Sequence, residues 1–297
     1  MEVPSNKRVF ITGISGFTGK HLENYLSEKG FDVYGSSLLE TSSKHFKCDI
    51  LSEESLYQIL DEVKPDYVIH LAAISFVAAE DQLNIYNVNV FGTLNLLNAA
   101  ARLAYTPKKI LIASSAAVYG NIEGELNENM HPRPVNHYGN SKLVMENMVK
   151  PFFDKLDIII VRPFNYTGVG QRENFLIPKI VTHFKAGKKE IDLGNIDVHR
   201  EFNDVSFVTK CYTKLILSDI KSDIFNICTG RVYSIKEILA LMSEISGYKI
   251  QVNVNPNFVR KNEIQLLKGS TKKLFPIIDD FVEEFNIQKT LLEMFKA

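Results

Sequence analysis

The stretch Arg8-Val-Phe-Ile-Thr-Gly-Ile-Ser-Gly-Phe-Thr-Gly19 carries glycines at positions 13, 16 and 19, a G-x-x-G-x-x-G spacing. The apolar run before these glycines predicts a buried strand, and the pattern from Lys20 to Lys29 predicts a helix after them. Glycine allows a sharp turn and a close approach of the backbone to a pyrophosphate. The N-terminus of the following helix supplies N–H donors and the positive end of its dipole. This order of strand, turn and helix therefore predicts a dinucleotide-binding turn.

Short β-branched runs alternate with helical patterns through the first half of the chain. Further strands are predicted at 31–35, 67–71, 109–113 and 158–161, and further helices at 53–63, 85–103 and 138–153. Apolar strands that alternate with helices indicate a parallel sheet covered on both faces. The predicted fold class is α/β, a Rossmann-type doubly wound parallel sheet with a smaller, interleaved C-terminal lobe.

The second half of the chain is less regular. It predicts a strand at 224–228 and helices at 178–185, 207–218 and 234–246. We expect residues 1–165 to form the dinucleotide-binding domain and residues 166–297 to form mainly a substrate-binding lobe, with about 195–228 returning to the first domain. The substrate is expected between the two.

Composition argues against several classes of protein. The 35 acidic and 34 basic residues leave a net charge of -1, without the basic surplus typical of proteins that bind nucleic acid or anionic membranes. No signal peptide and no membrane span are expected, because polar residues interrupt the most apolar helix at 88–104. The three cysteines are odd in number and widely spaced, which indicates a reduced, cytoplasmic setting.

Four further motifs follow the glycine turn in order. They are His70-Leu-Ala-Ala73, Asn89-Val-Phe-Gly-Thr93, Ser114-Ser-Ala-Ala-Val-Tyr-Gly120 and Tyr138-Gly-Asn-Ser-Lys142. Together with the glycine spacing, they resemble the extended short-chain dehydrogenases/reductases that act on nucleotide sugars. The resemblance implies a nicotinamide cofactor and a nucleotide-sugar substrate.

The resemblance also implies which residues contact the cofactor. The pyrophosphate would be surrounded by Gly13, Gly16, Phe17, Thr18 and Gly19, the adenine would be flanked by Asp49 and Ile50, and the path to the nicotinamide would be lined by Leu71, Ala72 and Ala73. Enzymes that use NAD usually place an acid at the end of the second strand, for the ribose 2′-hydroxyl. Here Ser36 and Ser37 occupy that region, without the arginine often found beside such serines. This favours NADP(H) and leaves NAD(H) open.

A tyrosine and a lysine four residues apart lie on one face of a helix. An ammonium beside a phenol favours the phenolate, so the tyrosine can exchange a proton with a carbonyl or hydroxyl oxygen. The spacing alone is weak, because Tyr25–Lys29 and Tyr105–Lys109 share it. Only Tyr138–Lys142 follows the strand predicted at 109–113 and a loop, where the active-site helix of the resembled family begins. Tyr138, Lys142 and Ser115 are therefore the predicted catalytic residues, and Tyr138 and Lys142 would also contact the cofactor.

The second half resembles the GDP-4-dehydro-6-deoxy-mannose reductases (GDP-rhamnose synthases) through Arg162–Gln171, Asn174–Pro178, Gly194–Val205 and Asn226–Arg231. By that resemblance, the substrate would be contacted by Ser75, Ser115, Asn165, Arg200, Arg260 and Glu263. Arginine suits a diphosphate because its planar fork donates two hydrogen bonds. The family's R-P-x-E motif is Arg260-Lys-Asn-Glu263 in this sequence, which leaves the identity of the nucleotide base open.

The leading hypothesis is an NAD(P)H-dependent reductase of the C4 keto group of a 4-keto-6-deoxysugar, with GDP as the preferred carrier. The alternatives are a reductase of a dTDP-, UDP- or CDP-linked 4-keto sugar, a 4-epimerase that retains NAD⁺, and a binding protein without activity. Ala116 and Ala117 stand where the resembled dehydratases carry an acid and its partner, so 4,6-dehydration is not expected.

Two expectations concern metals and assembly. The seven histidines show no metal-ligand spacing, and His70 is predicted to be a structural residue at the end of a buried strand. The helices containing Asn95–Leu103 and Leu143–Phe152 carry more apolar residues than one sheet face should cover. We therefore expect a homodimer through these helices, which the resembled family commonly pairs.

Overall fold

The computed structural model describes residues 7–39, 42–75, 81–258, 264–278 and 284–297. The chain divides into two compact units. Unit 1 comprises residues 1–120, 131–163 and 209–225, and unit 2 comprises residues 121–130, 164–208 and 226–297. Each unit has its own apolar core.

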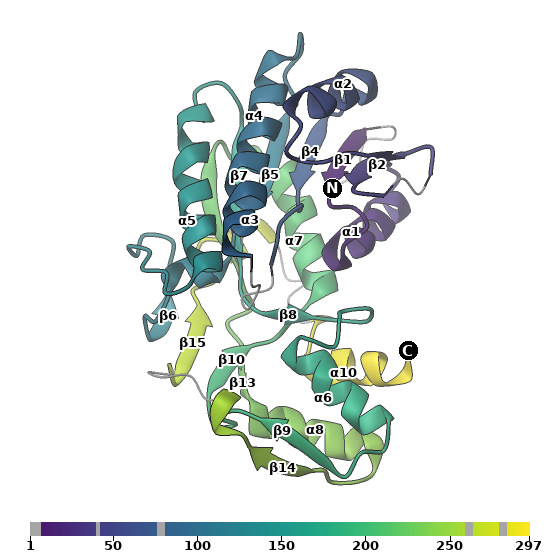
Figure 1. Cartoon of the computed structure of the whole chain (residues 1–297), viewed down its shortest axis with the longest axis vertical. Helices are drawn as coiled ribbons and strands as arrows, with labels where there is room; N and C mark the ends of the chain where they lie inside the picture. Colours follow the sequence, from purple (N-terminus) through teal and green to yellow (C-terminus); the bar gives the residue numbers. More distant parts are fainter. Residues whose placement is uncertain (1–6, 40–41, 76–80, 259–263, 279–283) are drawn as a thin grey trace. The chain divides into compact units, whose positions relative to one another are not determined.

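A seven-stranded sheet forms the centre of unit 1 (Figure 1). Its order is β12-β7-β5-β4-β1-β2-β3, and the pairs from β3 to β7 are all parallel. The strands are β1 (Arg8–Thr12), β2 (Asp32–Ser37), β3 (His45–Lys47), β4 (Tyr67–His70), β5 (Lys109–Ala113), β7 (Ile158–Pro163) and β12 (Asp223–Ile227). The strand order reverses between β1 and β4, and such a switch point opens a crevice at the carboxyl ends of the strands. The predicted Rossmann-type fold is confirmed.

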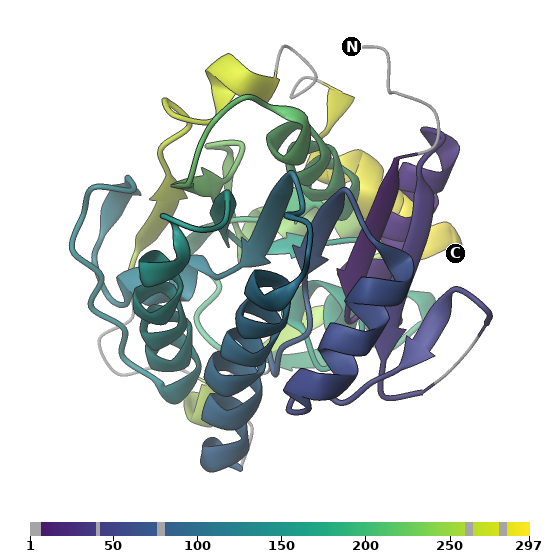
Figure 2. The same ribbon diagram turned by 90° about the horizontal axis from the view of Figure 1, so that it is seen from above.

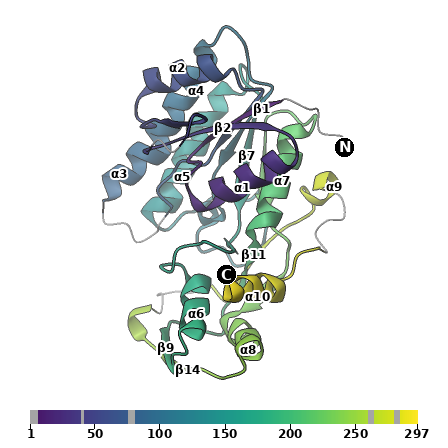
Figure 3. The same ribbon diagram turned by 90° about the vertical axis from the view of Figure 1, so that its right-hand side faces the viewer.

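Helices cover both faces of this sheet (Figures 2 and 3). They are α1 (Phe17–Glu28), α2 (Glu53–Val63), α3 (Gln82–Tyr86), α4 (Gly92–Arg102), α5 (His137–Val149) and α7 (Val205–Leu217), with short 3₁₀ turns at Ala116–Tyr119 and Lys150–Phe152. Helices α2, α4 and α5 bury their apolar side chains against alternate strand residues such as Phe10, Val68 and Ile110. Because side chains alternate along a strand, the residues between these point to the other face, where α1 and α7 lie.

Two local features of unit 1 differ from the sequence-based prediction. The helix expected at 85–103 is divided by a π-helical turn at Asn87–Phe91 between α3 and α4. Strand β3 was not predicted, because its three residues His-Phe-Lys are too short to show an alternating pattern. Both features lie beside candidate site residues.

Unit 2 combines a small sheet with four described helices, three of which pack together. The sheet has the order β13-β10-β15-β6, formed by β13 (Val232–Ser234), β10 (His199–Glu201), β15 (Leu266–Gly269) and β6 (Gly124–Leu126). Two further pairs are β14 (Gln251–Val254) with β9 (Glu190–Leu193), and β11 (Asn203–Asp204) with β8 (Tyr166–Thr167). The helices are α6 (Leu176–Lys185), α8 (Ile235–Ser246), α9 (Phe275–Ile278) and α10 (Ile287–Lys296), with a 3₁₀ turn at Pro256–Phe258. Helices α6, α8 and α10 enclose the apolar core of this unit.

A buried carboxyl group joins the segments of unit 2. Glu201 is 1% exposed and accepts hydrogen bonds from the backbone N–H groups of Gly269 (2.6 Å), Thr229 (3.0 Å) and Gly230 (3.2 Å). Burial raises the pKa of Glu201 to about 7, although these donors act in the opposite direction. The carboxyl therefore holds β10 to β15 and to the turn before β13. Within the described parts of the chain, no helix is both long and apolar enough to cross a membrane.

Candidate active site

The glycine turn between β1 and α1 is tight and packs closely against neighbouring backbone. Gly13 has φ +73°, and a Cβ there would lie 2.9 Å from the backbone nitrogen of Ala72. A Cβ on Gly19 would lie 2.5 Å from the carbonyl oxygen of Gly13, so any side chain would force the turn apart. Gly16 is the N-cap residue of α1 and has no side chain with which to cap the helix. The N-terminal end of α1 is thus suited to an anionic pyrophosphate.

A series of hydrogen bonds through Thr12, His70 and Thr93 connects the segment after β4 to the residue before this turn. Thr12 Oγ1 accepts a hydrogen bond from the Ala72 N–H (3.2 Å) and lies 2.6 Å from His70 Nδ1. Thr93 Oγ1 donates to the Asn89 carbonyl and lies 2.9 Å from His70 Nε2. Each hydroxyl has one proton, so Nε2 carries the proton of a neutral imidazole and Nδ1 accepts. Burial lowers the pKa of His70 to about 3, which agrees with a neutral imidazole and with a structural histidine.

Ser115, Tyr138 and Lys142 come from two neighbouring elements of unit 1. Ser115 follows β5 and caps the 3₁₀ turn Ala116–Tyr119, where its Oγ accepts from the Ala117 N–H (3.1 Å). Tyr138 is the second residue of α5, which is capped by Asn136. A Cβ on Gly139 would lie 2.7 Å from the Ala117 carbonyl oxygen, so glycine allows α5 to approach the turn that carries Ser115. These contacts bring together the elements that carry the three predicted catalytic residues.

Lys142 is almost completely buried. The residue is 3% exposed, and its Nζ donates a hydrogen bond to the Ala113 carbonyl at the end of β5 (2.8 Å). Burial lowers the pKa of Lys142 to about 8, while the negative charge of Glu146 opposes this shift. The ammonium form therefore predominates at neutral pH and is lost under mildly alkaline conditions.

We expect kcat/KM at saturating cofactor to fall as pH rises through about 8. The physical reason is that Lys142 becomes neutral above its pKa, and a neutral amine cannot stabilise a phenolate. Glu146→Gln should move this falling limb to lower pH, because Glu146 raises the pKa of Lys142. A pH–rate profile of both proteins tests this, and an identical alkaline limb in the variant would contradict it. Circular dichroism checks that the variant is folded.

A buried ion pair behind Lys142 was not predicted from the sequence. Arg162 on β7 donates to both carboxylate oxygens of Glu146 on α5, at 2.9 and 2.6 Å. The same carboxylate accepts from Ser114 Oγ (2.6 Å), and Arg162 Nη1 donates to the Tyr119 hydroxyl (3.0 Å). Ser114 thus holds α5 in place by bonding to Glu146. The Glu-Arg pair lies 16 positions apart in sequence, beyond the range of a local pattern.

Asn89, in the π-helical turn, connects two segments that are far apart in the sequence. Its Nδ2 donates to Ser141 Oγ on α5 (2.9 Å), and its Oδ1 accepts from the Ile74 N–H (2.8 Å). Ser141 Oγ in turn donates to the Tyr138 carbonyl (2.8 Å). Asn89 therefore links the segment after β4 to the first turn of the helix that carries Tyr138. Its motif is recognisable in the sequence, but this role becomes visible only in the structure.

The residues expected near the adenosine lie at the ends of β2 and β3. Ser36 and Ser37 are buried, and the Ser37 hydroxyl exchanges hydrogen bonds with the backbone of Leu39. Asp49 is exposed and accepts from the Leu51 N–H (3.0 Å), whereas Ile50 packs against Gly92 at the start of α4. Leu71, Ala72 and Ala73 are half-buried beside the glycine turn.

The expected substrate residues fall in both units. Ser75 is exposed in unit 1, and Asn165 is exposed in unit 2. Arg200 on β10 is half-buried and donates through Nη2 to the Ile264 carbonyl (2.7 Å). Arg260 and Glu263 lie outside the described residues.

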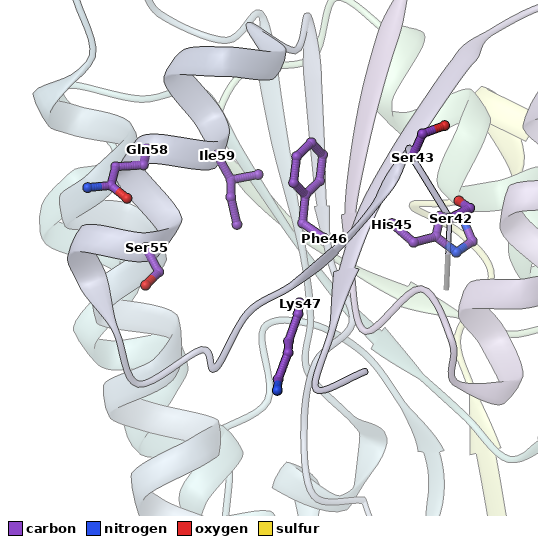
Figure 4. Close-up of a pocket in the computed structure, with 8 residues that line it drawn as sticks. All are labelled: Ser42, Ser43, His45, Phe46, Lys47, Ser55, Gln58 and Ile59. Carbon is purple, nitrogen blue, oxygen red and sulfur yellow. The ribbon is translucent and has the colours of Figure 1, made fainter. Parts of the chain in front are cut away.

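Two open pockets have linings that do not include Tyr138. One, of about 340 Å³, lies beside β3 and α2 (Figure 4) and is lined by Ser42, Ser43, His45, Phe46, Lys47, Ser55, Gln58 and Ile59. The other, of about 380 Å³, lies in unit 2 and is lined by Lys179, His183, Lys188, Glu190, Ile191, Asp192, Asn253 and Phe258. Within the described ranges, no group of three or more His, Cys, Asp or Glu side chains could hold a metal ion.

The chain is similar to several known proteins. The family described as GDP-mannose 4,6 dehydratase matches residues 10–279. The chain is 37% identical to GDP-6-deoxy-D-talose 4-dehydrogenase from Aggregatibacter actinomycetemcomitans, over 97% of each chain. It is 31% identical to GDP-6-deoxy-D-mannose reductase from Pseudomonas aeruginosa, over 90% of each chain. The structure of RMD from Pseudomonas aeruginosa complexed with NADPH has a TM-score of 0.84 and 28% identity, with 98% of this chain and 97% of that one covered.

Proposed function

This chain belongs to the GDP-mannose 4,6-dehydratase family of extended short-chain dehydrogenases/reductases, and from that premise we propose that it reduces the C4 keto group of a nucleotide-linked 4-keto-6-deoxysugar. The observation that carries the proposal is the arrangement of Ser115, Tyr138 and buried Lys142 at the carboxyl end of β5, in the same unit as the glycine turn. The relatives named for C4 oxidation or reduction of GDP-6-deoxysugars support the same reaction.

The glycine turn fits a nicotinamide dinucleotide, because Gly13 and Gly19 allow a tight turn that a Cβ would force apart, and Gly16 supplies no side-chain cap at the start of α1, where a pyrophosphate can accept hydrogen bonds. When bound, the reduced nicotinamide supplies the hydride. The Tyr138 phenol donates a proton to O4 of the sugar, and the Ser115 hydroxyl donates a hydrogen bond to the same oxygen. The Lys142 ammonium stabilises the phenolate that remains.

GDP is the proposed carrier. Both curated relatives are named for GDP sugars, and Arg200 in unit 2 offers a guanidinium for a diphosphate. The product would be GDP-rhamnose or its C4 epimer, GDP-6-deoxy-talose, depending on which face of the sugar meets the nicotinamide. We further propose a cytoplasmic location, which the three buried cysteines support, because they form no disulfide within the described ranges.

A panel of GDP-, dTDP-, UDP- and CDP-linked 4-keto-6-deoxysugars tests this function. We expect stoichiometric consumption of NADPH or NADH with the GDP substrate, and a lower kcat/KM with the other carriers. An epimerase would interconvert a 4-hydroxy sugar without net consumption of reduced cofactor. That result, or a failure to oxidise NADPH and NADH with every sugar, would refute the reductase.

We also propose a homodimer through α4 and α5. Val144 and Met148 lie four residues apart on α5 and are 40% and 42% exposed, and Phe91, directly before α4, is 55% exposed. Light scattering should give twice the monomer mass of 33.7 kDa. Val144→Glu with Met148→Glu should give the monomer, whereas Leu292→Glu, an exposed position in unit 2, should not. A monomer mass for the unmodified chain would refute the dimer.

A further inference from the structure

The register between β2 and β3 brings a lysine beside the end of β2. Ser37, the last residue of β2, is paired with Lys47, the last residue of β3. Neighbouring strands lie about 4.8 Å apart, and paired residues project from the same face of a sheet. Figure 4 shows the side chains of Phe46 and Lys47 on opposite sides of β3. Lys47 and Ser37 therefore share one face, although ten positions separate them in sequence.

This shared face is the one that carries the glycine turn. Gly35 and His45 form the preceding pair on the same face. A Cβ on Gly35 would touch the Ile14 side chain of the glycine turn, and His45 Nε2 contacts Glu23 of α1 at 2.6 Å. A dinucleotide with its pyrophosphate at the start of α1 and its adenine near Asp49 would thus place its adenosine ribose near the ends of β2 and β3.

The basic side chains near the ends of β2 and β3 differ in whether an ion pair already occupies them. Lys44 is paired with Asp32 (2.6 Å), and His45 is paired with Glu23. Lys47 is exposed and forms no ion pair with any residue in the described part of the chain. Asp49 is the nearest acid along the chain, and one of its oxygens accepts from the Leu51 N–H (3.0 Å). A cation is therefore available on β3, beside the end of β2, where NAD enzymes usually place an acid.

The serines at the end of β2 supply no charge. Ser36 is 3% exposed and lies on the opposite face, paired with Phe46 of the apolar core. The Ser37 hydroxyl is occupied by both backbone groups of Leu39, and it shapes the turn that ends β2. A phosphate monoester carries close to two negative charges at neutral pH, so a cation binds it more strongly than hydroxyl groups alone.

We propose that Lys47 is the residue that selects NADPH over NADH, by binding the 2′-phosphate of the adenosine ribose beside Ser37. The proposal rests on the nicotinamide cofactor of the proposed function and adds the residue that discriminates between its two forms. The sequence favoured NADP(H) through Ser36 and Ser37 on β2. In this proposal, Lys47 on the neighbouring strand β3 recognises the charge of the 2′-phosphate.

Fluorescence titration of the full chain with NADPH and with NADH tests the proposal without any sugar substrate. The unmodified chain should bind NADPH more tightly. Lys47→Ala should weaken NADPH binding about ten-fold or more, because a charge-assisted hydrogen bond is lost, and should change NADH binding less than about two-fold. Lys47→Glu should reverse the preference, and Lys47→Arg should retain it. High salt should weaken NADPH binding more than NADH binding in the unmodified chain.

Lys44→Ala is the matched control, because Lys44 lies three residues away but is paired with Asp32. This variant should preserve the ratio of the two dissociation constants. Equal affinity of the unmodified chain for the two cofactors, or an equal loss of both in Lys47→Ala, would overturn the proposal. Failure of the sugar panel would refute the reductase alone and leave this binding result unaffected, so the two failures are distinguishable.

Discussion

Tyr138→Phe is expected to lower kcat by about 10²–10⁴-fold and to leave the dissociation constant of the cofactor nearly unchanged. The phenol proton is required as negative charge develops on O4 of the sugar, whereas the ring itself can keep its place at the start of α5. Ser115 can still donate a hydrogen bond to the oxygen, which accounts for a residual rate. Steady-state kinetics with the preferred 4-keto sugar, together with cofactor titration, measures both quantities.

Tyr105→Phe provides a matched control for this variant. Tyr105 shares the Tyr-x-x-x-Lys spacing, but its hydroxyl donates to the Leu60 carbonyl (2.9 Å). Loss of this hydrogen bond should lower stability by about 1 kcal/mol and leave kcat unchanged. Near-normal turnover of Tyr138→Phe would show that another group supplies the proton. Thermal melts of both variants separate a catalytic loss from a folding defect.

The second large effect that we expect is a loss of 4,6-dehydration, the reaction for which the matching family is named. Elimination requires a base for the C5 proton and an acid for the departing C6 hydroxyl. In the dehydratases that this sequence resembles, the residues just before the Val-Tyr-Gly motif or its equivalent include an acidic residue that acts as the base and a partner that assists departure of the hydroxyl. Here they are Ala116 and Ala117, in the 3₁₀ turn that Ser115 caps. Their methyl groups can neither accept nor donate a proton, so the elimination should be slower by about 10²–10⁴-fold or more.

GDP-mannose should therefore be recovered unchanged after incubation with the pure protein and cofactor. Mass spectrometry detects the loss of one water that dehydration would cause. Consumption of the 4-keto-6-deoxysugar by the same preparation is the control, since it shows that the protein is active. Formation of a 4-keto-6-deoxysugar from GDP-mannose or another parent sugar would contradict the assignment of Ala116 and Ala117.

Local patterns were sufficient for most of the nucleotide-binding sheet. The strand Arg8–Thr12, the helix Glu53–Val63 and the strand Lys109–Ala113 have the predicted bounds. These elements combine apolar runs of the right length with turn residues or caps at their ends, so their signals lie within a few neighbouring residues. The π-helical turn at Asn87–Phe91 had no such signal, because one extra residue in a helix hardly changes its apolar period.

The sequence by itself determined the α/β class, the glycine turn and the candidate pair Tyr138 and Lys142, because each depends on residues close together in the chain. Only the tertiary structure placed Lys47 beside Ser37 and Glu146 against Arg162. The first contact depends on the register of two parallel strands, and the second on the packing of α5 against β7. Register and packing follow from the burial of side chains throughout the sheet, so no local stretch of sequence specifies them.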